Sequence, residues 1–570
     1  MSQSQNGEGR HFDVRIGVIC DTFFYESVCS AADFVYIPPV KATWADVKGI
    51  DVLLMVSTWS GLNGNEWVGF ASAGTKHRAL AMRLIAECRA NGVKTVFYSK
   101  DDPPNFERFT EIASACEFVF TSCEEMIPKY MELCGHDRVW TMPFCVCDSL
   151  KFAGCRRDSG VGDKVVFAGS WRRKYPKRCT HLRMLFKGVR KAGVPLDIYD
   201  RDFWRRKSEY RYPRKFREFV HPAVEHKDLQ KIHETAKWAI NVNTVTSSAT
   251  MFAYRVYELL AAGVNVISNY SYGMRRFFPS VSIAYSARIA ADIMGRTPDG
   301  VLELQRIIGR RDVMTWYSAS KVLGKMLERI GLPQCADGSS KDPEMPSLPS
   351  PAEPLYGDCH VKISPKRRLR ISISVGSDWR GLILATVPSL LRCERFGNFD
   401  IALRGISDDN PQARDFAEWL ARDFANIHIE EDGARRPKGA VLLAAGDEVF
   451  ATAFDEFAAL AERQILSSVT APAILCGRTL RFRRHGVRIG SRYALRVWKM
   501  RLPVLCHYGD FGDNVGKKYP PKRRKSSASQ MTNSYCQNIG LAKMLRKVLL
   551  GKRKKGKRKK RRRARMKGEK

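Results

Sequence analysis

Short apolar runs alternate with amphipathic stretches along the first part of the chain. The runs rich in β-branched and aliphatic residues are Val14–Cys20, Val52–Ser57, Thr95–Ser99 and Val119–Thr121. A helical pattern occupies Ala79–Asn91 between the second and third runs. Strands that alternate with helices predict a parallel, doubly wound sheet. Ligands of such sheets bind beyond the carboxyl ends of the strands, which is where Asp21, Ser57 and Lys100–Asp102 fall.

A second unit repeats this pattern. Its predicted strands are Lys164–Ala168, Leu196–Tyr199, Trp238–Val242 and Val264–Ser268, and its predicted helices are His181–Ala192, His226–Thr235, Met251–Ala262 and Val301–Ile330. Two such units that face each other across a cleft form the α/β architecture called GT-B. We therefore expect two Rossmann-like domains, one at residues 14–150, after a disordered start at 1–13, and one at 151–330.

The remaining chain divides into a linker, a third unit and a tail. Six prolines fall between Pro333 and Pro354, a composition that predicts an extended segment without a core, so we place a linker at 331–366. A smaller α/β unit is predicted at 367–512, with strands at Leu369–Val375, Asp400–Leu403 and Ile427–Ile429 and a helix at Pro411–Phe424. The alternating, Arg-rich run at 478–496 predicts exposed strands.

Charge is concentrated at the carboxyl end. The chain has 570 residues and a net charge of +37. Residues 517–570 hold 23 Lys or Arg against one acid, Glu569. A basic tail at 513–570 is typical of proteins that meet anionic surfaces such as lipid head groups or nucleic acid. The start of the chain has no signal-peptide pattern, and no apolar stretch approaches the length of a membrane span.

The sharpest local pattern runs from Asn241 to Gly263 and reads as a strand, a polar loop, a helix and a glycine stop. Ser247, Ser248 and Thr250 are good helix N-caps, and a helix N-terminus suits a diphosphate. Arg255 and Glu258 share a helix face, so Glu258 is a candidate for accepting ribose hydroxyls while Arg255 supplies positive charge. An ordinary surface ion pair explains the same spacing.

Two further segments are candidates for chemistry. Gly169 follows a predicted strand, and five cations, Arg173 and Arg178 among them, follow within nine residues. This arrangement suits a phosphate clamp, although a solvated basic loop has the same composition. Asp101 and Asp102 lie at another strand end and are candidates for a general base, but Asp102–Pro103 would equally serve as a helix N-cap.

These segments occur in an order that resembles the CgeB-type, spore-maturation-like GT-B glycosyltransferases over about residues 14–330. The matching stretches are Ser57–Trp67, Lys100–Pro103, Phe118–Ser122, Phe167–Ser170, Tyr175–Arg178, Leu196–Arg201, Asn241–Gly263 and Asn269–Gly273. The resemblance implies that the domain at 151–330 binds a nucleotide-sugar donor and that the domain at 14–150 lies on the acceptor side. It places Arg178 and Arg255 at the diphosphate and Glu258 at the ribose. Asp101 stands where the family pattern has a glutamate. Ser247 and Tyr254 replace an acid and a second arginine.

The third unit resembles, more faintly, the family-2 (GT-A) glycosyltransferases. Ile371–Val375 and Val387–Leu391 are similar to their first strand and helix, and Gly446–Glu456 is similar to the stretch that ends in a metal-binding Asp-x-Asp. Phe457 replaces the second of these acids, and a divalent metal needs convergent carboxylates. We expect a degenerate unit that is dispensable for donor turnover.

The sequence thus predicts a cytoplasmic, nucleotide-sugar-dependent glycosyltransferase of the hexosyltransferase type. The acceptor would be a cell-surface glycan or a polyol phosphate of the teichoic-acid kind, or a lipid-linked acceptor. No metal or other cofactor is expected, because cations can stabilise a diphosphate leaving group. The tail would attach the protein peripherally to the inner face of an anionic membrane. The alternative is a non-catalytic scaffold that binds nucleic acid or protein partners through its tail.

Overall fold

The computed structural model describes residues 12–151, residues 162–332 except 206, most of residues 345–449, and short segments up to residue 499. Residues 351, 358, 360, 366–368 and 432–440 lie outside the described part, as do residues 500–570. The predictions for the basic tail, for Glu456 and Phe457, and for most of 478–496 therefore concern residues outside this description. Of the last run, β18 (Arg483–Arg484) and β19 (Val487–Arg488) pair antiparallel.

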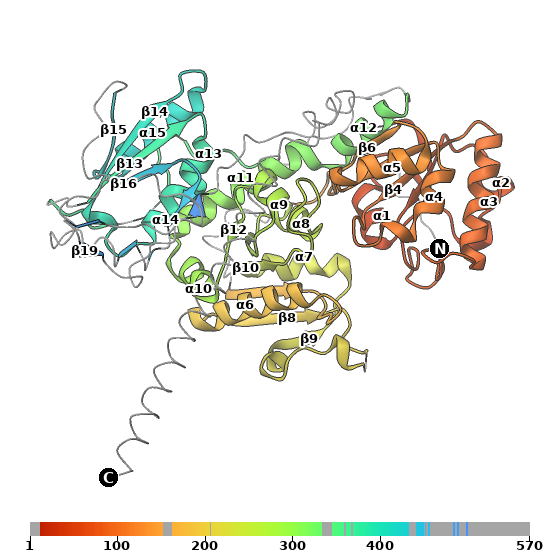
Figure 1. The fold of residues 1–570 in the computed structure, drawn as a ribbon, viewed down its shortest axis with the longest axis horizontal. Coiled ribbons are helices and arrows are strands. Elements are labelled where there is room, and N and C mark those ends of the chain that lie inside the picture. The colour runs from red at the N-terminus through yellow and green to blue at the C-terminus, as the bar shows by residue number, and fades with distance from the viewer. Residues whose placement is uncertain are drawn as a thin grey trace, which may run out of the picture.

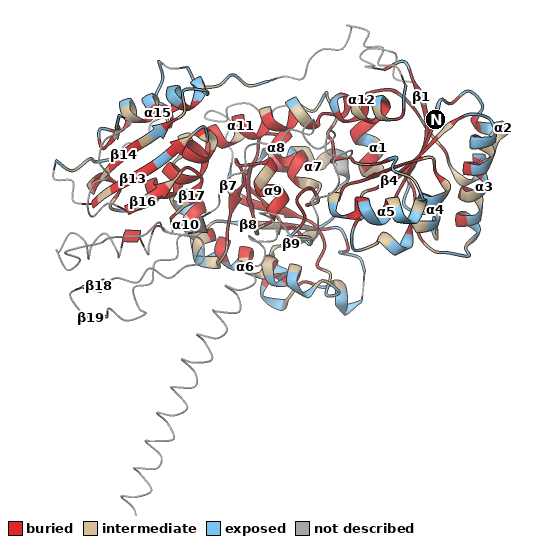
Figure 2. Ribbon diagram, turned by 45° about the horizontal axis from the view of Figure 1, so that its top comes forward, coloured by how far each residue is buried: buried red, intermediate tan, exposed pale blue. Residues whose placement is uncertain are grey.

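The first domain is a parallel six-stranded sheet in the order β2-β1-β3-β4-β5-β6. Its strands are β1 (Arg15–Ile19), β2 (Asp33–Tyr36), β3 (Val52–Val56), β4 (Lys94–Ser99), β5 (Phe118–Thr121) and β6 (Val139–Thr141). Its helices are α1 (Thr22–Val28), α2 (Trp44–Val47), α3 (Lys76–Ala90), α4 (Thr110–Ala115) and α5 (Ile127–Cys134). The short strands β2 and β6 carry too few apolar residues to stand out in the sequence. Figure 2 shows buried strands at the centre of this domain and exposed outer faces on α3, α4 and α5.

The second domain is also a parallel six-stranded sheet, in the order β12-β11-β10-β7-β8-β9. The strands are β7 (Gly162–Ala168), β8 (Leu196–Asp200), β9 (Val220–Pro222), β10 (Ala236–Asn241), β11 (Asn265–Ser268) and β12 (Ser282–Ile283). The helices are α6 (Pro176–Ala192), α7 (His226–Glu234), α8 (Arg255–Ala261), α9 (Tyr272–Phe277), α10 (Ala287–Arg296), α11 (Asp299–Tyr317) and α12 (Ala319–Arg329). The predicted pair of Rossmann-like domains facing a cleft, the GT-B architecture, is confirmed.

The predicted helix at 301–330 is two helices, because the chain turns at Ser318 to return to the first domain (Figure 1). Ser318 has an extended backbone, and the Asp148 carboxylate accepts a hydrogen bond from the Ser320 amide at 3.0 Å. Helix α12 packs Val322, Leu323 and Met326 into the core of the first sheet. Helix α12 therefore follows the second domain in the sequence but packs into the hydrophobic core of the first domain.

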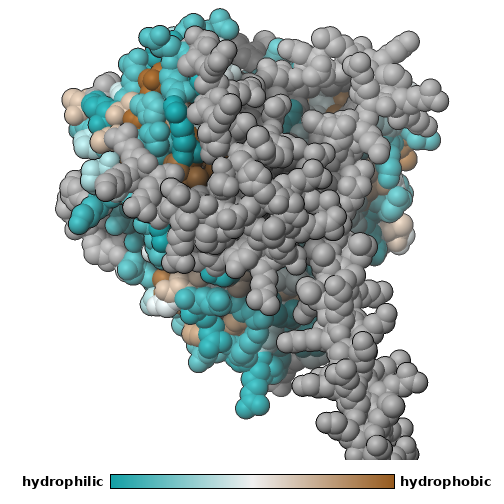
Figure 3. Space-filling view, turned by 60° about the vertical axis from the view of Figure 1, so that its left-hand side comes forward, coloured by the Kyte–Doolittle hydropathy of each residue, from teal (hydrophilic) through white to brown (hydrophobic). Residues whose placement is uncertain are grey.

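The third unit is a four-stranded parallel sheet in the order β15-β14-β13-β16. Its strands are β13 (Leu369–Gly376), β14 (Phe399–Ile406), β15 (Ile427–Ile429) and β16 (Val441–Ala444), with β17 (Asp447–Glu448) pairing antiparallel to β20 (Trp498–Lys499). Its helices are α13 (Trp379–Gly381), a π-helical turn at Leu382–Thr386, α14 (Val387–Leu391) and α15 (Pro411–Asp423). Where the surface of this side of the molecule is described, it is mainly hydrophilic with small separate apolar patches (Figure 3).

The segment predicted as a linker does contribute to a core. Leu355 and Tyr356 are buried between α11 and the third sheet, and the Tyr356 hydroxyl donates to the Ile383 carbonyl at 2.8 Å. A Cβ at Gly300 would overlap the Tyr356 carbonyl, so α11 needs glycine at this crossing. Proline restricts the backbone, but neighbouring apolar side chains can still pack. The prediction of a linker from composition did not take this packing into account. None of the described helices has the length and apolar character to cross a membrane.

Candidate functional site

A pocket of about 460 Å³ lies between the first two domains, at the carboxyl ends of their strands. Of the residues predicted for function, Asp101, Gly169, Arg178, Arg255 and Glu258 line it. Parallel sheets gather strand ends at one edge, which is why residues from segments far apart in the sequence meet here. The structure brings these five together and places Asp102, Arg173 and Thr250 elsewhere.

The second-domain wall is built around the contact between Gly169 and Arg255. The Arg255 guanidinium lies over the ring of Phe167, 5.2 Å from its centroid. A Cβ on residue 169 would stand 2.9 Å from Phe167 Cζ and 3.0 Å from Arg255 Nη2. Glycine at this position therefore lets the guanidinium pass directly over the turn that follows β7. The Tyr212 hydroxyl holds the same turn by donating to the Gly169 carbonyl at 2.5 Å.

Three arginines share this wall: Arg178 at the start of α6, Arg201 after β8 and Arg255 at the start of α8. Burial, reinforced by the positive charge of Arg178, lowers the pKa of Arg255 to about 10. Burial also lowers the pKa values of Arg178 and Arg201. Glu258 and Tyr212 offset part of the repulsion at Arg255. Cations that destabilise one another in a partly desolvated pocket are stabilised by a bound polyanion.

The opposite wall comes from the first domain and carries carboxylates. Lys100 Nζ lies 2.6 Å from Asp21 Oδ2 and 3.8 Å from Asp101 Oδ2. Burial disfavours the charge on Lys100, but the two carboxylates outweigh it and raise the lysine pKa above its ordinary value. The Ser57 hydroxyl donates to Asp101 at 3.1 Å and accepts from the Lys100 amide at 3.0 Å. These contacts hold the Asp101 carboxylate at the pocket in a fixed orientation.

Asp102, the second candidate base, is turned into the first domain. It is fully buried and accepts hydrogen bonds from the Thr121 hydroxyl at 2.6 Å and the Tyr130 hydroxyl at 3.2 Å. Burial raises its pKa to about 6, against the effect of these hydrogen bonds. Successive residues at a strand end point in opposite directions, so only Asp101 of the pair reaches the pocket. The position of Asp102 suits a structural link between β4, β5 and α5.

Thr250 joins the two domains and lies outside the pocket lining. Its hydroxyl donates to the Ser122 carbonyl at 2.9 Å and accepts from the Glu124 amide at 2.9 Å. Next to it, the Glu125 carboxylate accepts from the Ser248 hydroxyl and the Ala249 amide, both at 2.7 Å. Ser248 Oγ also accepts from the Thr250 and Met251 amides, at 3.2 and 2.9 Å, so its capping contact serves this loop and not α8. The loop stays irregular until α8 begins at Arg255.

Two other sequence predictions differ from the structure. Arg173 lies on an exposed part of its loop, outside the pocket lining, and its amide donates to the Glu209 carbonyl at 3.2 Å. Ser247 and Ser248 do not cap α8, because the residue before its first turn is Tyr254. The Tyr254 hydroxyl instead forms a hydrogen bond with Ser27 of the first domain. Tyr254 thus closes one side of the pocket between the domains.

Sequence reasoning assigned no role to Arg201, although it belongs to the Leu196–Arg201 stretch. Its guanidinium lies 5.9 Å from the ring centroid of Phe23, across the pocket in the first domain. The signal was available, because Arg201 follows β8 as Gly169 follows β7. The strand-end rule that selected Gly169 selects Arg201 as well. The pocket wall of Ala223, Val224 and Leu229 had no comparable sequence signal.

The acid predicted to remain from an Asp-x-Asp motif, Asp455, makes structural contacts. Its two oxygens accept from the amides of Glu394 and Arg395 at 3.0 Å each, and Arg296 Nη2 lies 3.6 Å away. Within the described residues, no three His, Cys, Asp or Glu side chains are grouped as metal ligands would be. Metal independence remains a prediction.

No family model and no curated protein matches this chain. Solved structures with a similar fold include an alpha-glucosyltransferase in complex with UDP and a 13-mer DNA (9% identity, TM-score 0.36, covering 56% of this chain and 99% of that chain). Another is the T4 phage BGT in complex with UDP and Mn²⁺ (11% identity, TM-score 0.33, covering 56% of this chain and 100% of that chain). A third is AviGT4, a glycosyltransferase involved in avilamycin A biosynthesis (11% identity, TM-score 0.31, covering 56% of this chain and 97% of that chain). The two sheets and the pocket between them support the proposed function, and these similarities are not used for it.

Proposed function

We propose that this protein is a glycosyltransferase that moves a sugar from a nucleotide-diphosphate donor to an acceptor hydroxyl. The observation that carries the proposal is the pairing of opposite walls: Arg178, Arg201 and Arg255 on one side of the pocket, and Asp21 and Asp101 on the other. A reaction that releases a diphosphate and takes a proton from an acceptor uses both kinds of charge beside the reacting carbon.

The arginine wall would hold the donor. Arg178 and Arg255 would contact the diphosphate, as the sequence predicts, and Arg201 joins them at the mouth of the pocket. Negative charge on the diphosphate grows as its bond to the sugar breaks, so the same cations stabilise the transition state more than the bound donor. Glu258, on the same face of α8 as Arg255, would accept hydrogen bonds from the ribose hydroxyls.

The carboxylate wall would act on the acceptor. Asp101 is the better of the two predicted bases, because it lines the pocket and Ser57 fixes its orientation. Lys100 bridges Asp101 and Asp21, which holds both carboxylates at the pocket, where a general base is needed. Transfer of the acceptor proton to Asp101 would accompany attack of the acceptor oxygen on the sugar.

We further propose that the chain belongs to the CgeB-type family and that the third unit has a GT-A-like origin. The proposed acceptor is a cell-surface glycan or a polyol phosphate of the teichoic-acid kind. Cytoplasmic localisation, with the basic tail at an anionic membrane, belongs to the same proposal. The support is the ordered series of sequence stretches around the pocket and the charge of the tail. The alternative, a non-catalytic scaffold for nucleic acid or a protein partner, makes no use of the charged pocket.

Calorimetric titration with nucleoside diphosphates tests the proposal on the full chain. Glu258→Gln and Arg178→Ala should each weaken nucleotide binding about tenfold to hundredfold, because each loses a charge-assisted contact worth about 1.5 to 3 kcal/mol. Arg288→Ala, an exposed position on α10 of the same domain, is the matched control and should bind normally. Unchanged binding in both pocket variants would reject the donor site and favour the scaffold.

A further inference from the structure

A basic lobe projects from the mouth of the pocket, and the donor site does not account for it. The lobe is residues 201–217, which contain eight Lys or Arg and two acids. It begins at Arg201, and the chain re-enters the pocket wall at Ala223 and Val224 after β9. Whatever binds the lobe therefore lies beside the pocket.

The base of the lobe is rigid. Phe216 is fully buried and Tyr212 nearly so, and the hydroxyl of Tyr212 is bonded to the turn at Gly169. The buried Asp202 carboxylate lies 3.4 Å from Arg172 Nε and 3.1 Å from Arg205 Nε. The Asp202 carboxylate is already shared between Arg172 and Arg205, which leaves Glu209 as the exposed acid among the eight cations of the lobe.

The outer face presents exposed cations, of which Lys215 has its Nζ 5.0 Å from the ring centroid of Phe216. Arg211, Arg214 and Lys215 are exposed, and in the described part of the chain none of them has a carboxylate within ion-pair distance. The positive surface continues onto α6: slight desolvation and the charges of Lys187, Arg183 and Arg190 lower the pKa of Lys215. Such a stripe attracts an extended polyanion by releasing its counterions.

The lobe offers one free aromatic platform. Trp204 is 79% exposed and Phe203 is 38% exposed, and their ring centroids lie 5.0 Å apart in an edge-to-face pair. The third ring, Tyr210, is covered by the guanidinium groups of Arg172 and Arg205, at 5.9 Å and 5.1 Å from its centroid. Single-stranded nucleic acid is bound by rows of aromatic rings that stack successive bases. A single exposed aromatic pair among many cations fits a polymer whose charged groups repeat but which has no planar bases to stack.

We propose that the lobe at 201–217 docks the acceptor, and that the acceptor is a phosphodiester-linked polymer of polyols or sugars, with Arg211, Arg214 and Lys215 at its phosphates and Trp204 against a sugar ring. This inference rests on the proposed function for its link to transfer. A large, flat indole with an N–H at its edge suits the apolar face and the hydroxyls of a sugar. The lobe then leads the polymer toward Asp101.

Hydrogen exchange of the full chain, without nucleotide, tests the docking surface. Synthetic oligo(glycerol phosphate), bare or glucosylated, should protect amides within 203–217. Reversing the charge at Arg211, Arg214 and Lys215 together (R211E, R214E, K215E) should abolish this protection and weaken binding about tenfold or more, with a shallower salt dependence. The control reverses Lys41, Lys48 and Lys76, which are exposed on the first domain near α2 and α3, and should keep the protection. The basic tail is present in every variant, so its contribution cancels.

Trp204→Ala separates the sugar contact from the phosphate contacts. It should weaken binding of the glucosylated oligomer several-fold and leave the bare oligomer unchanged. Absence of protection in the lobe, or equal loss in both charge-reversed triples, would overturn the proposal. Stronger protection by oligo(dT) than by either oligomer would assign the lobe to nucleic acid instead. Because no donor is present, failure of the donor site leaves these results unaffected, and normal nucleotide binding by the lobe variants shows that the pocket is intact.

Discussion

Gly169 and Arg255 approach so closely that a Cβ on residue 169 would lie 3.0 Å from the Arg255 guanidinium. The two residues come from different strand–helix units, after β7 and at the start of α8, and they meet at the cation wall of the pocket. The contact explains why the turn after β7 carries glycine. It also ties the position of the arginine to the backbone.

Gly169→Ala should therefore displace Arg255 without unfolding the protein. We expect nucleoside diphosphate affinity to fall about tenfold, as for the loss of one charge-assisted contact, with little change in melting temperature. Gly162→Ala is the control, since a Cβ there has only ordinary contacts at 3.9 Å or more. Equal affinities for the two variants would show that Arg255 does not touch the donor.

Substitutions of the neighbouring acids Asp101 and Asp102 should have different effects on the turnover rate. Asp101→Asn should lower kcat about 10²- to 10⁴-fold, the usual contribution of a general base. Asp102→Asn should leave turnover of the folded enzyme near normal, because residue 102 faces Thr121 and Tyr130 inside the domain. Steady-state transfer assays decide between them. A larger loss in Asp102→Asn than in Asp101→Asn would reverse the assignment.

Asp102 should instead govern part of the pH dependence of stability. Its pKa is about 6 in the folded protein and about 3.9 when unfolded, so the folded state holds this proton more tightly. The stabilisation is complete below about pH 4 and is lost as pH rises to about 6, by roughly 3 kcal/mol. Asp200 and Asp312, whose pKa values burial also raises to about 6, add to the same decline. Denaturant unfolding should therefore show a decline that is smaller by about 3 kcal/mol in Asp102→Asn than in the wild type. Asp101→Asn should retain the full decline.

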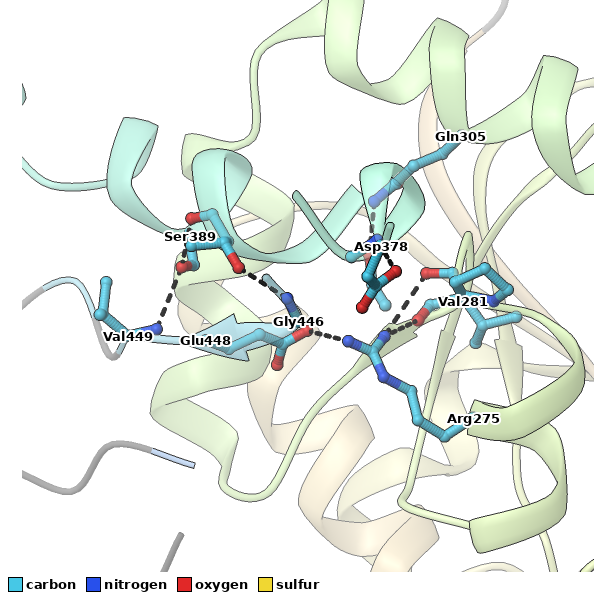
Figure 4. Close-up of polar contacts among 12 residues, drawn as sticks. Arg275, Val281, Gln305, Asp378, Ser389, Gly446, Glu448 and Val449 are labelled. Atoms are coloured by element: carbon cyan, nitrogen blue, oxygen red, sulfur yellow. Dashed lines mark hydrogen bonds and ion pairs between the residues drawn. The ribbon is translucent and has the colours of Figure 1, made fainter. Parts of the chain in front are cut away.

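The third unit is tied to the second domain more firmly than its sequence indicated. Arg275 of α9 is buried and lies 3.0 Å from Glu448, while its other amine faces the carbonyls of Pro279 and Val281 (Figure 4). Asp312 of α11, fully buried and with its pKa raised to about 6 by burial, pairs with Arg380. Val301, Leu304 and Ile308 of α11 belong to the hydrophobic core of the third sheet.

A chain that ends near Arg329 should consequently be unstable and prone to aggregate, contrary to the expectation that the third unit is dispensable. In the full chain, Glu448→Ala should lower the free energy of unfolding by about 3 kcal/mol, because it leaves Arg275 buried and unpaired. Glu418→Ala, at an exposed position on α15, should change it little. A soluble, active chain ending near Arg329 would restore the original expectation.

The basic tail is predicted to bring the protein to anionic membranes. Residues 551–570 carry 14 cations and one acid, each cation contributing up to about 1 kcal/mol near an anionic surface. Full-length protein should sediment with anionic vesicles at low salt, be released at high salt, and ignore neutral vesicles. A chain ending at Tyr535 should remain in the supernatant. Equal sedimentation of both chains would remove the tail from the localisation argument.

The sequence by itself determined the strands that carry the site and the residue types at their ends. Apolar runs and the residues that terminate them are local properties, so β1, β3, β4, β7, β8, β10 and β11 and the pocket residues Gly169, Arg178, Arg255 and Glu258 could all be found along the chain. The same strand-end rule would have found Arg201. Short strands such as β2 and β12 leave too few apolar residues to detect.

Only the tertiary structure decided which side of each segment faces the pocket. Asp101 and Asp102 are adjacent in sequence and chemically equal, and the packing of β4 against β5 turns one outward and buries the other. Ser248 and Thr250 are good helix caps by type, but their hydroxyls donate to Glu125 and Ser122, more than 120 residues earlier, and α8 begins only at Arg255. A side chain's partner across a domain boundary depends on distances that no local pattern encodes. For this reason the chemistry could be predicted from the sequence and its final arrangement could not.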